Sequence, residues 1–331
     1  MELLKVENLV TEFNTDYGKV KAVGGVSFYI NEGEIVGFVG ESGSGKSTIM
    51  LSVMQLLGDS GKGKHHTISG IVSFEGENLL DYDYKSSKMC KIRGGKISMI
   101  FQEPMTSLNP TMKIGDQLTE MLRLHLNLDK ASAKAKAIEL LDLVKIPNAA
   151  ARFNDYPHNF SGGMRQRVMI AMAISCSPRI IIADEFTTAL DVTTQAQVLT
   201  ELRNLVKGLQ KTSLIIVTHN LGLIARYSDR IYVLYAGKIV ETGTTKQIFG
   251  DPRHPYTKGL LACVPRLDQS ASDKRLYTIP GYPPDLLNLP QHCSFYERCE
   301  FADKECGQKK SPELKVVCEE HMAACYLCAE K

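Results

Sequence analysis

The stretch Ile35-Val-Gly-Phe-Val-Gly40-Glu-Ser-Gly-Ser-Gly-Lys46-Ser47 decides the fold of this 331-residue chain. An apolar run over residues 35–39 predicts a buried strand, and a helical pattern begins at Ser47. Between them lies a loop that fits G-x-x-x-x-G-K-[ST]. In such a loop, successive backbone N–H groups curl around a polyphosphate, and the following helix adds the positive end of its dipole. The order of strand, loop and helix therefore predicts a nucleotide phosphate site.

Side chains of the same loop supply the rest of that site. We expect Lys46 to bridge the outer phosphates and the Ser47 hydroxyl to ligate Mg²⁺. The candidate nucleotide-binding residues here are Gly40, Ser42, Gly43, Gly45, Lys46, Ser47 and Thr48.

Apolar runs rich in β-branched residues recur through the first 250 residues, and several are continuous rather than alternating. They cover residues 35–39, 68–74, 97–101, 180–183, 214–217 and 231–234. Continuous runs are typical of strands buried on both faces, and helical patterns lie between them. The sequence thus predicts an α/β domain with a largely parallel core.

Two departures from this alternation suggest the domain organisation. Residues 114–144 follow a wholly helical pattern, which predicts a helical insertion between two strands, or else another face of the core. After His254, six prolines and then a group of cysteines replace the regular pattern, which predicts an appendage with little periodic structure. We expect a domain over residues 1–250 with a helical subdomain at about 105–160, and a C-terminal extension over residues 251–331.

In the segment Ile180-Ile-Ile-Ala-Asp184-Glu185, an apolar run ends in two carboxylates. A carboxylate at the C-terminal end of a parallel strand lies beside the phosphate loop, so Asp184 can hold Mg²⁺ through water and Glu185 can polarise the attacking water. Without a phosphate loop, such a pair would more simply be a solvated turn.

The segment Phe160-Ser161-Gly162-Gly163-Met164-Arg-Gln-Arg precedes that strand, and its helix N-terminus offers N–H groups to a γ-phosphate. Here the sequence resembles the ABC ATPases, whose signature loop is close to L-S-G-G-Q. The resemblance covers residues 1 to about 250, with the motifs in the expected order.

The resemblance implies roles for four further residues. Tyr17 matches the aromatic residue that stacks on adenine, and Gln102 matches the glutamine that links Mg²⁺ to the helical subdomain. Asp191, after Ala189 and Leu190, matches the D-loop. His219 matches the switch histidine and, with Glu185, is the expected catalytic pair.

The resemblance also implies an activity and partners. Two such ATPase domains dimerise head to tail, so that the Ser161–Gly163 loop of one completes the ATP site of the other. Hydrolysis of Mg-ATP then drives two membrane permease subunits, one of which inserts a coupling helix into the helical subdomain. We expect a heterodimer with a similar ATPase, with a homodimer as the alternative.

Two residues depart from the family pattern. Phe186 stands where proline usually follows the catalytic glutamate, and Asn220 stands where aspartate often follows the switch histidine. Neither side chain is assigned a phosphate or metal contact, so we expect activity to be retained. The first departure leaves open how tightly Glu185 is held.

The C-terminal residues refine the resemblance. His254-Pro-Tyr-Thr-Lys-Gly-Leu-Leu, Val264-Pro-Arg and Ile279-Pro-Gly-Tyr-Pro-Pro are similar to the extension of oligopeptide and dipeptide importer ATPases. This implies uptake of short peptides, with an extracellular substrate-binding protein as an indirect partner. Nickel importers carry related ATPases and remain an alternative. The segment at His254 is predicted to dock the extension on the core.

Six of the nine cysteines crowd the final 39 residues, which in a reducing cytosol indicates a metal site before a disulfide framework. Four of them match the cysteines of the importer extension: Cys293, Cys299, Cys306 and Cys325. Four thiolates suit a [4Fe-4S] cluster or zinc, and the wide spacing favours the cluster. Free thiols are a third possibility, and Cys318 and Cys328 fall outside the pattern.

Composition excludes several other classes. The chain carries 39 Lys plus Arg and 37 Asp plus Glu, so its charge does not indicate nucleic acid as a partner. There is no apolar run long enough for a membrane span and no signal peptide at the N-terminus. We expect a peripheral protein on the cytoplasmic face of the cell membrane. A soluble ABC ATPase and a metal-cluster redox sensor are the rival interpretations.

Overall fold

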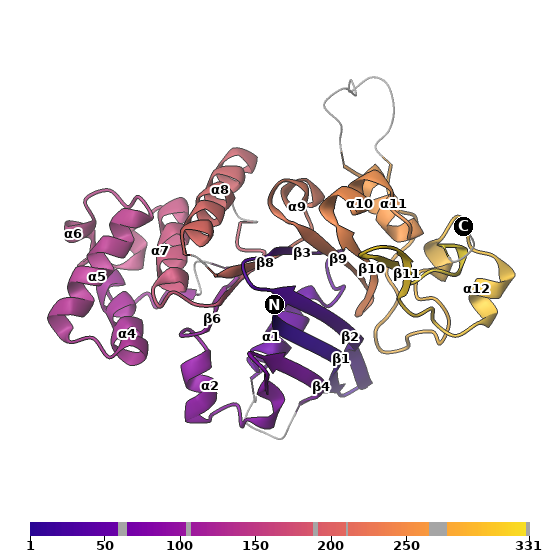
Figure 1. Cartoon of the computed structure of the whole chain (residues 1–331), viewed down its shortest axis with the longest axis horizontal. Helices are drawn as coiled ribbons and strands as arrows, with labels where there is room; N and C mark the ends of the chain where they lie inside the picture. Colours follow the sequence, from indigo (N-terminus) through magenta and orange to yellow (C-terminus); the bar gives the residue numbers. More distant parts are fainter. Residues whose placement is uncertain (59–64, 104–106, 188–190, 210, 265–276, 329–331) are drawn as a thin grey trace. The chain divides into compact units, whose positions relative to one another are not determined.

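The computed structural model describes residues 1–58, 65–103, 107–187, 191–209, 211–264 and 277–328. The chain divides into two compact units, and Figure 1 labels their helices and strands. The helical unit comprises residue 1, Asn31–Ile35 and Asp81–Ile216, and the β-rich unit comprises Glu2–Ile30, Val36–Leu80 and Val217–Lys331.

The helical unit contains a short stretch of parallel sheet. Its strand order is β8-β7-β6, with β6 (Ile97–Ile100), β7 (Ile180–Asp184) and β8 (Ser213–Thr218), the last of which begins in this unit. β6 and β7 run parallel with Ile97 opposite Ile180. All five residues of β7 are buried, as expected for a strand covered on both faces.

Helices make up most of the rest of this unit. They are α2 (Ser87–Ile92), α4 (Ile114–Leu126), α5 (Lys130–Leu143), α6 (Ala149–Arg152), α7 (Gly162–Ile174) and α8 (Val192–Gly208), with the 3₁₀ turn η2 (Pro157–Asn159). α4, α5 and α7 pack together. Ile114, Leu118 and Leu122 are fully buried and recur at intervals of four, so they form one apolar face of α4. The helices predicted between residues 114 and 144 are therefore confirmed.

The β-rich unit contains two groups of strands. The first has the order β2-β1-β4-β5, with β1 (Glu2–Thr15), β2 (Gly18–Asn31), β4 (His66–Phe74) and β5 (Glu77–Asn78). The second has the order β11-β12-β10-β9-β3, with β3 (Ile35–Val39), β9 (Arg230–Tyr235), β10 (Lys238–Thr244), β11 (Lys315–Cys318) and β12 (His321–Ala323).

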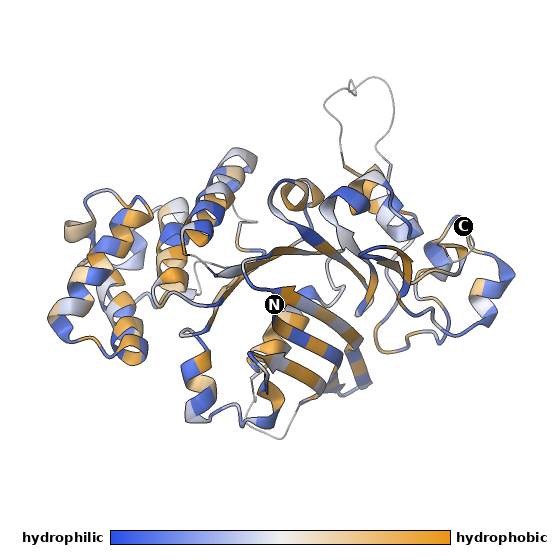
Figure 2. Ribbon diagram, viewed as in Figure 1, coloured by the Kyte–Doolittle hydropathy of each residue, from blue (hydrophilic) through white to orange (hydrophobic). Residues whose placement is uncertain are grey.

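The strands of the first group were the hardest to predict. β1 pairs antiparallel with β4, so the predicted strand at residues 68–74 lies outside the parallel part of the fold. β1 alternates buried and exposed residues, and Figure 2 shows the same banding of apolar and polar residues along β1, β2 and β4. Alternation is typical of a sheet with one face in solvent, and a search for continuous apolar runs misses it.

In the second group, only part of the sheet is parallel. β3 and β9 run parallel with Val36 opposite Arg230, whereas β10 runs antiparallel to β9. The helices of this unit are α1 (Lys46–Val53), α9 (Leu221–Tyr227), α10 (Thr245–Gly250), α11 (Pro255–Ala262) and α12 (Lys304–Gln308), with the 3₁₀ turns η1 (Leu79–Asp81), η3 (Tyr296–Arg298) and η4 (Tyr326–Cys328).

The C-terminal extension contains more regular structure than the sequence predicted. Its strand β12 pairs antiparallel with β10, placing Ala323 opposite Glu241, and β11 pairs with β12. These strands are only four and three residues long, which is too short to give a periodic signal in the sequence. The expectation of an appendage with little periodic structure was therefore wrong at this point. None of the helices in the described ranges is long and apolar enough to cross a membrane.

Candidate functional site

The phosphate loop joins β3 to α1 in the β-rich unit. All five residues of β3 are buried, so the loop starts from a fixed point. Two of its glycines are required by close backbone approach. Gly40 and Gly45 have φ values of 157° and 96°, and an added Cβ would lie 2.2 Å from the Leu234 carbonyl oxygen and 2.6 Å from the Ala22 carbonyl oxygen, respectively. A side chain at either position would displace the loop.

Lys46 is the first residue of α1, and only 4% of its surface is exposed. Its Nζ donates hydrogen bonds to the carbonyl oxygens of Gly40 at 2.8 Å and Glu41 at 3.0 Å. The ammonium group therefore lies over the loop itself. Ser47 and Thr48 follow in the first turn of the helix, and Ser42 and Gly43 lie in the turn before it.

The predicted carboxylates end β7 in the helical unit. Asp184 is 5% exposed, and Glu185 has a φ of 42°, in the left-handed region that is costly for a side chain with a Cβ. Gln102 donates from Nε2 to Glu185 Oε2 at 3.1 Å. The structure thus brings together two residues that lie 83 positions apart and that the sequence placed at the same site.

A residue that sequence reasoning missed supports this strand end. Gln166 on α7 is fully buried, and its Nε2 donates to the backbone oxygen of Phe186 at 2.8 Å. The Phe186 side chain is itself 2% exposed. Phenylalanine at this position is therefore held by burial and by a hydrogen bond to its carbonyl, which fixes the residue next to Glu185.

The serine-glycine loop forms the N-terminus of α7. Ser161 is the N-cap, and its hydroxyl accepts from the Met164 amide at 3.4 Å. A Cβ added at Gly162 or Gly163 would meet no atom within 4 Å, so there is open space beside this helix end. The free amide groups of a helix N-terminus favour an anion at such a place.

Three further predicted residues lie at element ends. Asp191 caps α8 by accepting from the Thr194 amide at 3.0 Å, and this hydrogen bond lowers the pKa of its carboxyl. His219 is exposed after β8, followed by Asn220, which caps α9. Tyr17 is 89% exposed in the turn between β1 and β2. Ala189 and Leu190 lie outside the described residues.

The predicted nucleotide-site residues fall into two sets. The phosphate loop, Tyr17 and His219 belong to the β-rich unit, and the other residues belong to the helical unit. Within the sets, the structure joins Gln102 to Glu185 and joins Lys46 to its own loop.

Comparison with known proteins assigns the chain to a family. The family model described as ABC transporter matches residues 23–188, which is half of the chain. The chain belongs to the ABC transporter family. A second model, described as the C-terminal region of oligopeptide/dipeptide transporters, matches residues 240–306 of this ABC transporter protein.

Relatives and solved structures agree with that membership. The chain is 48% identical over 329 residues to the oligopeptide transport ATP-binding protein OppD of Haemophilus influenzae, covering 99% of this chain and 98% of that protein. It is 50% identical over 315 residues to OppD of Bacillus subtilis, covering 95% and 86%. The dimeric structure of MJ0796, a bacterial ABC transporter cassette, has a TM-score of 0.63 at 28% identity and covers 73% of this chain and 98% of that one.

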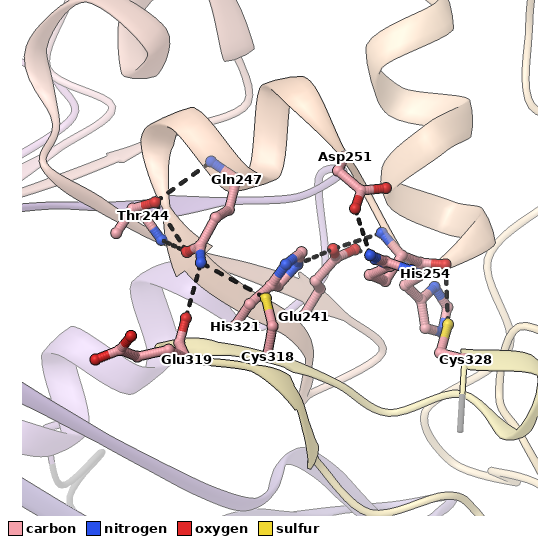
Figure 3. Close-up of polar contacts among 10 residues, drawn as sticks. Glu241, Thr244, Gln247, Asp251, His254, Cys318, Glu319, His321 and Cys328 are labelled. Carbon is pink, nitrogen blue, oxygen red and sulfur yellow. Dashed lines mark hydrogen bonds and ion pairs between the residues drawn. The ribbon is translucent and has the colours of Figure 1, made fainter. Parts of the chain in front are cut away.

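In this ABC transporter protein, a buried carboxylate holds the C-terminal extension (Figure 3). Glu241 on β10 is 0% exposed. Its Oε1 accepts from the Arg253 amide at 2.7 Å and pairs with His321 Nε2 at 2.7 Å, and its Oε2 accepts from the His254 amide at 2.8 Å. One side chain thus joins β10 to the start of α11 and to β12.

The predicted docking segment at His254 makes the contacts that this role requires. Burial lowers the pKa of His254 to about 4, so the imidazole is neutral at physiological pH and its Nδ1 accepts from the Tyr256 amide at 3.0 Å. The hydroxyl of Tyr256 accepts from the Glu41 amide at 2.8 Å, inside the phosphate loop. The segment therefore connects the extension to the nucleotide-binding part of the β-rich unit.

The four predicted cysteine ligands line one pocket, together with His254 and Phe295: Cys293, Cys299, Cys306 and Cys325. Burial raises the pKa of the Cys299 thiol to about 11, and a hydrogen bond with Cys328 lowers the pKa of Cys325 to about 7. Over the described ranges, no three histidine, cysteine, aspartate or glutamate side chains are placed to hold one metal ion. Of the two C-terminal cysteines outside the predicted set, Cys318 Sγ accepts from Gln247 Nε2 at 3.7 Å, and Cys328 contacts Cys325 and lies 3.0 Å from the Arg253 oxygen.

Proposed function

We propose that this chain is the ATP-hydrolysing subunit of a membrane importer for oligopeptides or dipeptides. The observation that carries the proposal is near full-length identity of 45–50% to four oligopeptide transport ATP-binding proteins. The match over residues 240–306 adds to it because that model describes the C-terminal region of peptide transporters. An ATPase for a nickel importer is the second candidate.

The proposed ATP site combines the residues predicted from the sequence. The phosphate loop would bind the β- and γ-phosphates through its amides and Lys46, and the exposed ring of Tyr17 would stack on adenine. Oxygen donors from Ser47, Gln102 and Asp184 would hold Mg²⁺, which favours hydroxyl, carbonyl and carboxylate ligands. When bound, that ion neutralises charge on the phosphates.

For hydrolysis, we assign Glu185 to the attacking water. A carboxylate can orient and polarise a water molecule, and the Gln102 amide fixes its position from one side at 3.1 Å. His219 is the second proposed catalytic residue and would contact the γ-phosphate. A related cassette, MJ0796, has been solved in a post-hydrolysis state bound to ADP and Pi, at 27% identity.

We further propose that the site is completed by a second ATPase subunit. The α7 N-terminus at Ser161–Gly163 has open space beside it and no side chain beyond Ser161 to fill it. It would contact the γ-phosphate held by the other subunit, with Asp191 at the same interface. The assembly would include two permease subunits and a similar or identical ATPase.

This mechanism is tested with Glu185→Gln in the full chain and its copurified partners. We expect Mg-ATP to bind with unchanged affinity while hydrolysis falls by more than about 100-fold, because the water loses its base. Light scattering is expected to show that two ATPase subunits of this variant stay associated while ATP is present and separate when it is removed. Normal turnover in this variant would remove Glu185 from its assigned role.

For the cysteine pocket, we propose a [4Fe-4S] cluster with Cys293, Cys299, Cys306 and Cys325 as ligands. Support comes from the donor set, since all four thiols line one pocket and soft sulfur ligands suit iron-sulfur clusters. A zinc ion is the alternative and would require the thiolates to close to within about 4 Å of one another, given Zn–S bonds of about 2.3 Å.

Anaerobic purification tests the cluster. We expect a brown protein with about four iron and four sulfide per chain, and loss of colour in Cys299→Ser but not in Cys318→Ser, whose thiol is exposed outside the pocket. A colourless protein with one zinc per chain would replace the cluster with the alternative.

A further inference from the structure

The phosphate loop is held by an arginine from the cysteine-rich part of the chain. Arg298 ends the 3₁₀ turn η3, directly before Cys299. Its Nη1 lies 2.6 Å from Glu41 Oε2, and its Nη2 lies 2.9 Å from Glu41 Oε1. Two parallel charge-assisted hydrogen bonds therefore join residues 257 positions apart. Glu41 is the first residue after Gly40 in the loop.

The guanidinium group is fixed on its other sides as well. The side chain of Arg298 is 4% exposed, its Nε donates to the Pro280 oxygen at 2.8 Å, and its Nη1 also donates to the Tyr235 hydroxyl at 3.3 Å. An arginine guanidinium is always charged in proteins, so both hydrogen bonds to Glu41 are charge-assisted. A planar fork held at each edge defines the orientation of the carboxylate that it binds.

Every polar group of Glu41 has a partner within the β-rich unit. Its carboxylate binds Arg298, its amide donates to the Tyr256 hydroxyl at 2.8 Å, and its carbonyl accepts from Lys46 at 3.0 Å. Tyr235, Tyr256 and Phe295 pack against one another behind this group, with ring centroids 4.6–5.4 Å apart. The loop therefore rests on a rigid support built partly from the extension.

We infer that Arg298 is a positioning residue for the nucleotide site: its pair with Glu41 holds the phosphate loop in its binding shape, so the C-terminal extension sets the affinity for nucleotide. A loop that must be ordered on binding loses affinity by the cost of ordering, and preorganisation removes that cost. The inference rests on the proposed phosphate site at Lys46. Arg298 acts through Glu41 rather than on the nucleotide.

The test measures the dissociation constant of fluorescent methylanthraniloyl-ADP in the presence of Mg²⁺. A fluorescent nucleotide is used because the chain has no tryptophan whose emission could report binding. We expect Arg298→Met and Glu41→Gln each to weaken binding roughly tenfold, within the usual range of coupling between sites. The double variant is expected to be no weaker than either single one, because both remove the same pair. Arg298→Lys, which keeps the charge without the fork, is expected to fall between.

Controls separate positioning from simple loss of stability. Arg167→Met removes a comparable guanidinium, bonded to the Val144 oxygen at 2.9 Å and to Glu201, in the helical unit, and is expected to leave affinity unchanged. Lys46→Ala is expected to abolish binding. If it binds normally, the proposed phosphate site is wrong. Suppose instead that Lys46→Ala fails to bind nucleotide. The positioning role of Arg298 alone is then refuted if Arg298→Met lowers the melting temperature without changing nucleotide affinity. It is also refuted if the losses of affinity in Arg298→Met and Glu41→Gln add in the double variant.

Discussion

Replacing Glu241 by glutamine should loosen the C-terminal extension from the rest of the β-rich unit. The change keeps the shape of the side chain and replaces one acceptor oxygen with an NH₂ donor. Glu241 is 0% exposed and accepts from Arg253, His254 and His321. The perturbation therefore acts on hydrogen bonding rather than on packing.

The expected loss of stability depends on which carboxylate oxygen of Glu241 the glutamine replaces with NH₂. Oε1 serves both Arg253 and His321, so the best arrangement of glutamine keeps that oxygen and turns its NH₂ toward the His254 amide. Two donors then face each other without an acceptor. At about 1–3 kcal/mol for each unsatisfied buried group, the expected loss is about 3 kcal/mol. At roughly 2–4 °C per kcal/mol for domains of this size, the melting temperature should fall by about 6–12 °C.

Thermal unfolding followed by circular dichroism measures this loss, and limited proteolysis should show faster cleavage of the extension. Glu319→Gln is the matched control because Glu319 is exposed on the adjoining turn and, among the residues that the structure describes, meets Gln247 through its backbone oxygen and not its carboxylate. We expect the control to melt within about 2 °C of the parent chain. A Glu241→Gln variant that does the same would refute the reasoning.

Three further changes have distinct expected outcomes. Gly45→Ala should abolish binding of methylanthraniloyl-ADP, because its Cβ would lie 2.6 Å from the Ala22 oxygen; retained binding would show that the loop can shift. Gln166→Leu should lower the turnover of ATP by roughly tenfold with KM unchanged, because it removes the hydrogen bond to the Phe186 carbonyl beside Glu185. A steady-state assay that finds only a change in KM contradicts this. Asn220→Asp should leave the melting temperature within about 2 °C, as both residues cap a helix equally well, and a larger shift would mean that Asn220 does more than accept from Gly222 and Leu223.

The parts of the fold and site that the sequence predicted are those fixed by neighbouring residues. The phosphate loop, β3, β7 and the Ser161 helix end are each determined within about ten residues, because glycine, apolar runs and capping residues act locally. The Gln102–Glu185 contact was within reach because the family resemblance placed both residues at one site.

The parts that could not be predicted depend on distant pairs. Glu241 and His321 lie 80 residues apart, and Glu41 and Arg298 lie 257 apart, so no local pattern marks either pair. A glutamate within a strand predicts a solvated face, whereas Glu241 is buried by partners that only the folded chain supplies. Gln166 is a similar case. In the sequence it is an ordinary polar residue of a predicted helix, and only the folded chain shows its hydrogen bond to the Phe186 backbone oxygen.

ATP-driven uptake of peptide by the reconstituted transporter tests the central claim most directly. The chain would be copurified with its membrane subunits, placed in vesicles with the extracellular binding protein, and supplied with labelled oligopeptide and Mg-ATP. The account predicts accumulation of peptide that requires ATP and is lost with Lys46→Ala. Accumulation of nickel but not peptide, or peptide uptake that persists in the Lys46→Ala variant, would contradict it.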